Sequence, residues 1–266
     1  MKILAITNQK GGVGKTTTCV NLAASLASLD KRVLLIDLDP QGNASTGSGI
    51  DKAHLKHSIY HVLIGEKTLQ DVVLRSEKGG YDVAPSNRDL AGAEVELVHE
   101  IAREMRLKHA IAKLKDFYDF VLLDCPPALN LVTVNALTAA NAVMIPMQCE
   151  YYALEGLSDL VNTIKKVRAH LNPTLEIEGL LRTLFDHRNM LANQVSAQLI
   201  SHFGNKVYKT IIPRNIRLAE APSYGLPVLN YDKNSKGAQA YIELAREIVS
   251  QSKQVLENIK KEVNHG

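Results

Sequence analysis

The chain has 266 residues, 45% hydrophobic and 22% charged, a composition that predicts a globular protein with a sizeable core. The formal net charge is only +3, so overall charge argues weakly for any anionic partner. The three cysteines, Cys19, Cys125 and Cys149, form no C-x-x-C pair, which argues against a zinc or disulfide framework and fits a reducing cytoplasm. Because no apolar run reaches membrane-spanning length, we expect no membrane contact.

The first predicted elements surround a glycine-rich loop near the N-terminus. The apolar run 3–6 predicts a short buried strand, and the spacing of apolar residues over 20–29 predicts an amphipathic helix. Between them lies N-Q-K-G-G-V-G-K-T-T at 8–17. Strand, glycine-rich turn and helix form the context that a phosphate-binding loop requires, so this stretch predicts a nucleotide site.

The residue types of the loop suit phosphate for separate physical reasons. Glycines let backbone amides approach a ligand closely, and these amides, with the positive end of the following helix, form a nest for phosphate oxygens. Lys15 adds a positive charge for the β- and γ-phosphates, and the hydroxyl of Thr16 can ligate Mg²⁺. The predicted nucleotide-binding residues of the loop are Gly11, Gly12, Val13, Gly14, Lys15, Thr16 and Thr17.

Further along the chain, predicted strands alternate with predicted helices. The runs 32–37 and 120–124 are apolar without alternation, which is typical of strands buried on both faces. The pattern predicts one α/β domain over 1–266, a mostly parallel twisted sheet with helices on both faces and ligands at the carboxyl ends of the strands. The other predicted strands are 81–84, 142–147, 177–185 and 207–212, and the helical stretches are 59–64, 69–74, 88–117 (more than one helix), 131–140, 154–171, 191–203 and 238–263.

Two aspartates follow predicted strands and should reach the sheet edge that carries the loop. Asp124 ends the apolar run 120–124, which suits a carboxylate that holds Mg²⁺, often through a water. Asp39 follows the strand at 32–37. An isolated acid after a strand is more often a helix cap or a turn residue, but two that converge on a phosphate loop indicate a functional site. Asp37 we interpret as structural.

The loop has the form K-G-G-x-G-K-[ST], with Gln9 where the usual phosphate-loop pattern has its first glycine. This form resembles the deviant Walker A loop of the ParA/MinD family of ATPases. The resemblance implies that Lys10 reaches across a dimer interface to the partner's nucleotide, with catalytic and ATP-binding roles, although sequence alone could equally make it a solvated loop lysine. It also implies that Asp39, in a Walker A′ motif, orients the attacking water, senses the γ-phosphate and belongs to the metal site.

Four longer segments look like those of ParA/Soj chromosome-partitioning ATPases and span nearly the whole chain. The resemblance implies a P-loop NTPase fold of the deviant Walker A type and adenine contacts by Pro213 and Asn215. The implied chemistry is Mg²⁺-dependent ATP hydrolysis by in-line attack of water. Nothing in the sequence identifies a strong general base, so we expect slow basal turnover that needs an activator. The segments are D-L-D-P-Q-G-N-A-S at 37–45, L-L-D-C-P-P at 122–127, Q-C-E-Y-Y-A-L-E-G-L at 148–157 and I-P-R-N-I-R-L-A-E-A-P-S at 212–223.

Positive charge gathers in residues 182–220, where six lysines and arginines face two acids, a local charge of +4 in a chain of +3. Such clustering is typical of contact with a phosphate backbone, although a solvated basic face is the common alternative. The resemblance places DNA-binding residues at Arg188 and Arg217. No helix-turn-helix or aromatic stacking platform is evident, so we expect contacts to double-stranded DNA without sequence readout.

The resemblance as a whole predicts a cytoplasmic, nucleoid-associated partition ATPase. Its ATP-dependent homodimer would bind DNA non-specifically and be released when a ParB-type centromere-binding protein stimulates hydrolysis. A second hypothesis is a MinD-like membrane-cycling ATPase, which needs a basic amphipathic tail; 256–263 has some of this character but carries two acids and no large aromatic. A third is an iron–sulfur reductase component of the nitrogenase iron-protein type, which needs two exposed cysteines per subunit.

Overall fold

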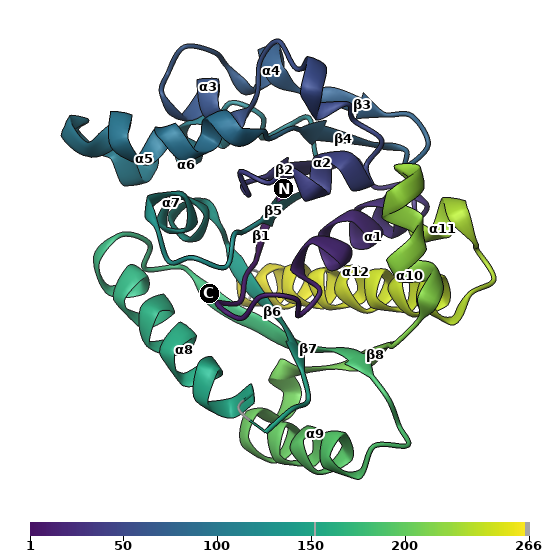
Figure 1. The fold of residues 1–266 in the computed structure, drawn as a ribbon. Helices are drawn as coiled ribbons and strands as arrows, with labels where there is room; N and C mark the ends of the chain where they lie inside the picture. Colours follow the sequence, from purple (N-terminus) through teal and green to yellow (C-terminus); the bar gives the residue numbers. More distant parts are fainter. Residues whose placement is uncertain (152, 264–266) are drawn as a thin grey trace.

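A single eight-stranded sheet organises the computed structural model, which describes residues 1–151 and 153–263 (Figure 1). The strand order is β3-β4-β2-β5-β1-β6-β7-β8, and all neighbouring pairs are parallel except β3 with β4. The predicted fold class is therefore confirmed. The strands are β1 (Lys2–Ile6), β2 (Val33–Asp37), β3 (Leu74–Ser76), β4 (Tyr81–Ala84), β5 (Phe120–Asp124), β6 (Ala142–Gln148), β7 (Glu176–Phe185) and β8 (Val207–Pro213).

Helices cover both faces of this sheet and enclose two separate cores. Apolar residues of α1, α2, α10, α11 and α12 belong to one core, and those of α3 to α9 belong to the other. The helices are α1 (Lys15–Ala27), α2 (Asn43–Gly47), α3 (Ile59–Leu63), α4 (Leu69–Val72), α5 (Ala93–Glu96), α6 (Arg106–Ala112), α7 (Leu131–Ala139), α8 (Ala153–His170), α9 (Met190–Phe203), α10 (Ile216–Glu220), α11 (Val228–Tyr231) and α12 (Lys236–Val263). Short 3₁₀ turns lie at 52–54, 88–92, 97–99, 103–105, 204–206 and 221–224.

The inner strands are apolar along their length because both faces of the sheet are covered. β2 and β5 are buried at all five of their positions. Successive side chains of a strand point to opposite faces, so Leu34 and Ile36 enter one core while Val33 and Leu35 enter the other. A run without polar alternation therefore predicted these two strands correctly.

The register of the three central strands fixes where the site can lie. Ile6 of β1 pairs with Asp124 of β5, and Asp124 pairs with Asp37 of β2. These strands end at one level, so the segments that follow them emerge side by side at one edge of the sheet. In an open α/β sheet this edge is where ligands bind.

The structure departs from the sequence interpretation in three stretches. Residues 69–74 do not form one helix, because α4 ends at Val72 and Leu74 begins β3, an antiparallel edge strand. α2, α10 and α11 were not predicted; they have five, five and four residues, too few to produce a helical period in the sequence. The pattern at 88–117 divides into short helical segments, as its length indicated.

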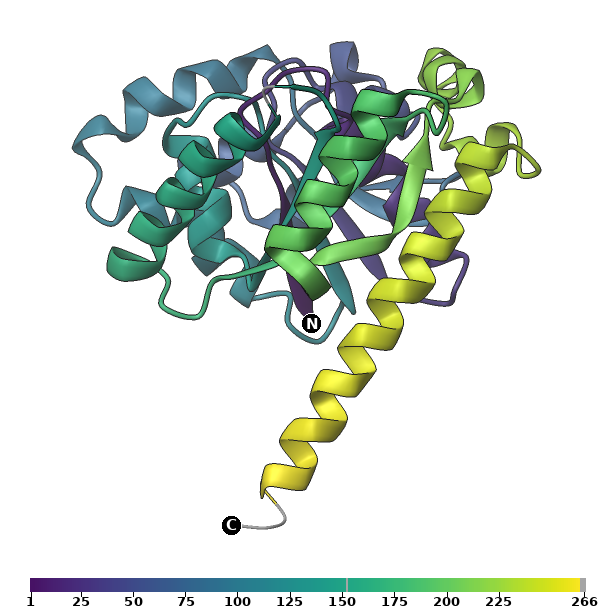
Figure 2. The ribbon, with the colours of Figure 1, turned by 90° about the horizontal axis from the view of Figure 1, so that it is seen from below.

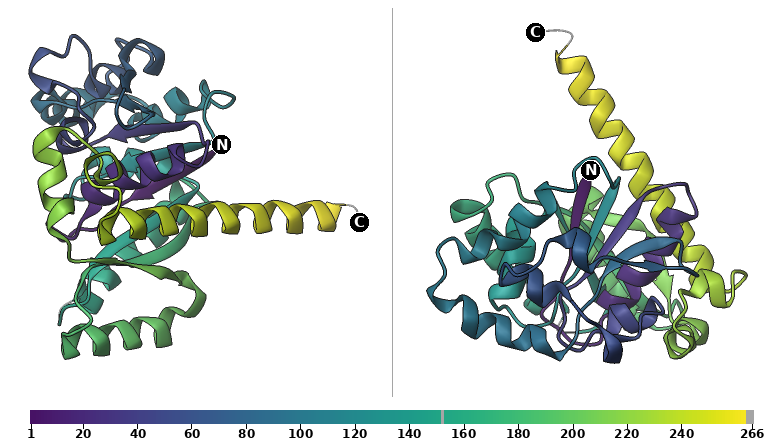
Figure 3. Two further views of the ribbon diagram at one scale, coloured as in Figure 1. Left: turned by 90° about the vertical axis from the view of Figure 1, so that its right-hand side faces the viewer. Right: turned by 90° about the horizontal axis from the view of Figure 1, so that it is seen from above.

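The C-terminal helix α12 begins two residues before its predicted start and projects beyond the body of the protein (Figures 2 and 3). Its first half packs against α1 and β8, where the carboxylate of Glu247 accepts hydrogen bonds from the amides of Lys209 and Thr210 and so covers the free edge of β8. The tail predicted to be amphipathic, 256–263, has side chains outside those that the structure describes. Within the described residues, no helix is long and apolar enough to cross a membrane.

Candidate nucleotide-binding site

The glycine-rich loop joins β1 to α1 and leaves the N-terminus of α1 without a side-chain cap. Gly12 and Gly14 have φ of +73° and +88°, in the left-handed region that favours glycine. Gly14 is the N-cap of α1, and no side chain accepts a cap hydrogen bond there, so the first amides of this helix are left for a ligand. Gly11 is not in the left-handed region, and a Cβ there would meet no atom within 4 Å. Two of the three predicted glycines are therefore required by the backbone.

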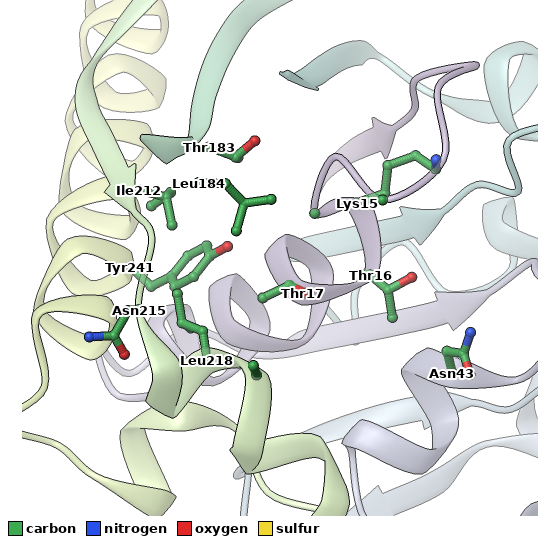
Figure 4. A pocket seen from close by; sticks show the side chains of 13 residues that line it. Lys15, Thr16, Thr17, Asn43, Thr183, Leu184, Ile212, Asn215, Leu218 and Tyr241 are labelled. Atoms are coloured by element: carbon green, nitrogen blue, oxygen red, sulfur yellow. The ribbon is translucent and has the colours of Figure 1, made fainter. Parts of the chain in front are cut away.

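A cavity of about 370 Å³ opens in front of this loop (Figure 4). One side is polar and formed by the loop and α1; the opposite side is formed by the ends of β7 and β8 with α10 and α12 and carries Leu184, Ile212, Leu218 and Tyr241. This division suits a ligand with anionic groups at one end and an apolar ring at the other. The lining residues are Gly12, Gly14, Lys15, Thr16, Thr17, Asn43, Thr183, Leu184, Ile212, Asn215, Leu218, Ala219 and Tyr241.

Several residues predicted from the sequence line this cavity and others do not. Lys15, Thr16 and Thr17 line it from α1, and Asn215 lines it from the opposite side, where its carboxamide oxygen accepts the amide of Arg217 and caps α10. Among the described lining residues, Pro213 is absent: it ends β8, one residue after Ile212. Gly11, Val13 and Lys10 lie in the loop without lining the cavity.

Lys15 is nearly buried, and its ammonium group donates to the carbonyl of Lys10 at 3.1 Å. Burial lowers the pKa of Lys15, while the negative charge of Asp124 opposes the shift. A loop carbonyl and a nearby carboxylate thus compensate this buried charge before any ligand is bound.

The carboxylate of Asp37 is fully buried and well satisfied. It accepts hydrogen bonds from the amide of Asp39 at 3.1 Å and from the amide and hydroxyl of Ser45 at 2.8 and 2.7 Å. These contacts tie β2 to the segment that follows it and fit the structural role expected for Asp37. Asp39 is partly exposed, and its carboxylate accepts the amide of Gln41 at 2.9 Å.

Asp124 is also fully buried but only half satisfied. One of its oxygens accepts the thiol of Cys19 at 3.4 Å; the other has no hydrogen-bond partner among the described residues. Burial and the neighbouring Asp37 raise the pKa of Asp124, and the Thr16 hydroxyl opposes this. An orphaned carboxylate oxygen beside a hydroxyl suits a hard divalent cation such as Mg²⁺.

The described residues contain no cluster of three or more His, Cys, Asp or Glu side chains that could hold a metal alone. A magnesium ion here would therefore take most of its ligands from water and phosphate, as this ion commonly does.

Lys10 points away from the cavity in the isolated chain. Its ammonium group contacts the carboxylate of Glu150 at 2.5 Å, and both side chains are about half exposed. An exposed ion pair contributes little free energy, so Lys10 is available for another anion at small cost.

Comparison with known proteins identifies the family. A family model described as an AAA domain matches residues 1–177. The chain is 54% identical to the sporulation initiation inhibitor protein Soj of Bacillus subtilis over 249 residues, 94% of this chain and 98% of that protein. It is 51% identical to the chromosome partitioning protein ParA of Caulobacter vibrioides over 255 residues, 95% of this chain and 96% of the other. The chain belongs to the ParA/Soj family.

A solved structure similar to this ParA/Soj chain is cobyrinic acid a,c-diamide synthase from Mycobacterium smegmatis. It is 38% identical with a TM-score of 0.84, covers 95% of this chain and 96% of its own, and was crystallised with ADP and with an ATP analogue, each with magnesium. The likeness supports the predicted fold over almost the whole chain.

Sequence analysis missed seven of the residues that line the cavity: Asn43, Thr183, Leu184, Ile212, Leu218, Ala219 and Tyr241. Leu184 has φ of +51°, a conformation that is strained for a leucine and turns the end of β7 beside the cavity. Thr183 and Leu184 lie near the carboxyl end of a predicted strand, so the position of that edge could have identified them. Tyr241 comes from a C-terminal helix whose docking on α1 no local pattern reveals.

The three cysteines do not suit an iron–sulfur cluster. Cys19, Cys125 and Cys149 are 0%, 1% and 6% exposed, whereas an iron–sulfur centre shared between subunits needs exposed thiols. The structure therefore gives no support to the iron–sulfur hypothesis for this ParA/Soj protein.

The basic cluster predicted over 182–220 is not one surface. Arg182 is only 6% exposed; its guanidinium donates to the hydroxyl of Ser196 and to the carbonyl of Tyr208, so it cannot contact DNA. Lys206 precedes the seven-residue strand β8 and Arg214 follows it, so they lie roughly 26 Å apart at 3.3 Å per residue. The charge count over 182–220 therefore combined residues from opposite ends of β8.

Arg188 and Arg217 both follow carboxyl ends of strands, on the edge that carries the loop, and each is ion-paired. Arg188 binds Asp186 through two nitrogens at 3.0 and 2.8 Å, which holds the pKa of Asp186 well below its usual range. Arg217 contacts Glu220 at 2.9 Å and Asp232 at 3.3 Å. The side chain of Arg188 is 90% exposed and that of Arg217 is 47% exposed, so both are accessible.

The two buried aspartates differ in how fully their oxygens are hydrogen-bonded, and this difference gives a prediction about stability. Asp124→Asn removes the burial cost and the repulsion from Asp37 that raise the pKa of Asp124. These costs outweigh the attraction of Asp124 for Lys15, so we expect the nucleotide-free protein to gain about 1–3 kcal/mol in free energy of unfolding. Asp37→Asn, at the same level of the neighbouring strand, should have the opposite sign, because an amide cannot accept all three hydrogen bonds. Urea unfolding without Mg²⁺ measures both. A loss of stability in Asp124→Asn would contradict the assignment.

Proposed function

We propose that this ParA/Soj-family protein is an ATP-hydrolysing switch for DNA segregation. In this proposal an ATP-dependent homodimer binds DNA non-specifically and is released when a ParB-type partner stimulates hydrolysis. The observation that carries the proposal is the open-amide loop beside the orphaned oxygen of Asp124. The names of relatives at 51–54% identity, and the ADP, ATP analogue and magnesium bound to the M. smegmatis protein, support it.

The residues of the chain suggest how each part of MgATP would be held. The loop amides and Lys15 would bind the β- and γ-phosphates, and Asn215 with the apolar side of the cavity would accept adenine. Thr16 and Asp124 would hold Mg²⁺, which neutralises charge on the transferred phosphoryl group. Asp39, partly exposed at the same edge, would orient the attacking water and take part in the metal site.

The edge around the cavity also suits a second subunit. Leu129, Met190 and Ile216 follow the carboxyl ends of β5, β7 and β8 and are 47%, 77% and 69% exposed. Large apolar side chains exposed around a ligand site are typical of a surface that another protein covers. A partner docked there would bring its own Lys10 to this nucleotide, which is the role that the family resemblance implies.

The first test concerns hydrolysis. Lys15→Ala should abolish ATP turnover, because the phosphates lose a fixed cation; Asp39→Ala should keep ATP binding but stall hydrolysis and accumulate an ATP-bound dimer. Phosphate release and gel filtration in MgATP measure these effects, with Asp116→Ala, an exposed acid before β5, as the matched control. Hydrolysis by Asp39→Ala at the wild-type rate would refute the role of that carboxylate.

The second test concerns assembly. Lys10→Ala should weaken ATP-dependent dimerisation while monomeric nucleotide binding stays largely intact, because Lys10 does not line the cavity of its own chain. Sedimentation velocity with ATP measures the dimer fraction. Lys78→Ala, exposed in the turn between β3 and β4 at the far edge of the sheet, is the control. Normal dimerisation of Lys10→Ala would show that Lys10 takes no part in assembly.

The third test concerns DNA. If Arg188 and Arg217 contact phosphates in both subunits, the dimer makes four contacts, worth a slope of roughly −3.6 in log affinity against log salt at about 0.9 per phosphate. The double alanine variant should lose about that slope on two unrelated duplexes alike, and binding should require ATP. The control is the double alanine variant of Arg32 and Arg75, which are also exposed and ion-paired. Fluorescence anisotropy at several salt concentrations, with and without ATP, measures the affinity of the wild type and of both double variants for each duplex. An unchanged salt slope in the Arg188 and Arg217 variant would place the DNA contact elsewhere.

A further inference from the structure

Two strand ends hold the carbonyl groups of the glycine-rich loop. The hydroxyl of Thr183 donates to the carbonyl of Val13 at 2.7 Å, and the side-chain amide of Gln148 donates to the carbonyl of Gly12 at 3.3 Å. Gln148 and Thr183 are direct partners in the parallel pairing of β6 with β7. Neighbouring strand ends thus bind consecutive carbonyls of the loop.

The direction of these carbonyls determines where the loop amides point. A peptide unit is planar and trans, so the carbonyl of one residue and the amide of the next point in opposite directions. When the carbonyls of Gly12 and Val13 face the ends of β6 and β7, the amides of Val13 and Gly14 face the opposite way. Amides that converge away from the protein surface are what a phosphate nest requires.

Other contacts of the same region keep the loop against β6. The side-chain amide of Asn8 donates to the carbonyl of Pro146 at 2.8 Å, and Lys10 contacts Glu150 just beyond the strand. Thr183 is only 2% exposed, and a Cβ added to Gly14 would lie 3.8 Å from its side chain. The hydroxyl of Thr183 is therefore fixed directly against the turn that opens α1.

We propose that Gln148 and Thr183 are positioning residues that orient the phosphate loop for the nucleotide. The proposal rests on the proposed function, because it takes a nucleotide phosphate as the ligand of the loop. Thr183 carries the larger share, since its hydrogen bond is short and buried, whereas that of Gln148 is long and exposed.

The same strand end also places the opposite side of the cavity. β7 and β8 lose their regular register between Arg182 and Phe185, and Leu184 takes its left-handed conformation there, directly after Thr183. Thr183 thus holds the phosphate end of the site while Leu184 lines the cavity across from it (Figure 4). The irregular end of β7 therefore contributes to both the phosphate side and the apolar side of the cavity.

Thr183→Val tests the proposal, because valine keeps the shape of threonine and removes the donor. Leaving the Val13 carbonyl unpaired should weaken binding of ADP and of a non-hydrolysable ATP analogue alike by about tenfold, since both share the phosphates that the loop holds. KM for ATP should rise in parallel, with a smaller change in kcat. Gln148→Leu should show the same pattern to a smaller extent.

Two further variants separate positioning from general stability. Thr183→Ser keeps the hydroxyl and should recover most of the nucleotide affinity. Thr138→Val is the matched control, because the Thr138 hydroxyl is buried in α7 and has no hydrogen-bond partner among the described residues. Fluorescent-nucleotide titration gives the affinities, and thermal unfolding without nucleotide shows whether each variant is folded.

The outcomes distinguish the two levels of inference. Wild-type protein that binds neither ADP nor the ATP analogue would overturn the proposed function itself. If the wild type binds nucleotide and folded Thr183→Val binds it with the same affinity, only the positioning role is overturned. Equal losses of affinity and stability in Thr183→Val and Thr138→Val would also overturn it, because the effect would then belong to core packing.

Discussion

The site depends on the burial of two carboxylates side by side at the level where three parallel strands end. Asp37 and Asp124 are register partners on β2 and β5, and both are fully buried. Ser45 and the backbone satisfy Asp37, while Asp124 keeps one oxygen without a partner in the described chain. Because buried like charges repel each other, Asp124 lowers the free energy of unfolding of the cation-free protein. A bound cation would offset this loss. The unsatisfied oxygen is therefore better explained by a ligand than by packing.

The sequence predicted the parts of this arrangement that local chemistry controls. Strands buried on both faces must be apolar throughout, which is why β2 and β5 were recognisable, and a loop with Gly12 and Gly14 in the left-handed region needs glycine there. The rule that parallel strands carry ligands at their carboxyl ends then placed Asp124 and Lys15 at one edge. These predictions needed no knowledge of which strands are neighbours.

What the sequence could not predict depends on tertiary neighbours and on chain direction. Arg182 was counted as a surface charge because nothing local shows that it points inward at Ser196. Lys206 was grouped with Arg214 because a sequence window ignores which end of a strand a residue occupies. The hydrogen bond between Thr183 and Val13 joins residues 170 positions apart. Such contacts follow only from strand order, which composition and periodicity do not determine.

The cations proposed to act on other molecules share one feature: in the isolated chain each is held by a carboxylate. Lys10 contacts Glu150, Arg188 contacts Asp186, and Arg217 contacts Glu220 and Asp232. Binding of a phosphate would then exchange one anion for another, so the net gain is a difference between two charge interactions in water. Such differences are small and weaken with salt. Proposed contacts of this kind would be individually weak, and only several acting together in a dimer would hold DNA, which is compatible with the proposed release of DNA on ATP hydrolysis.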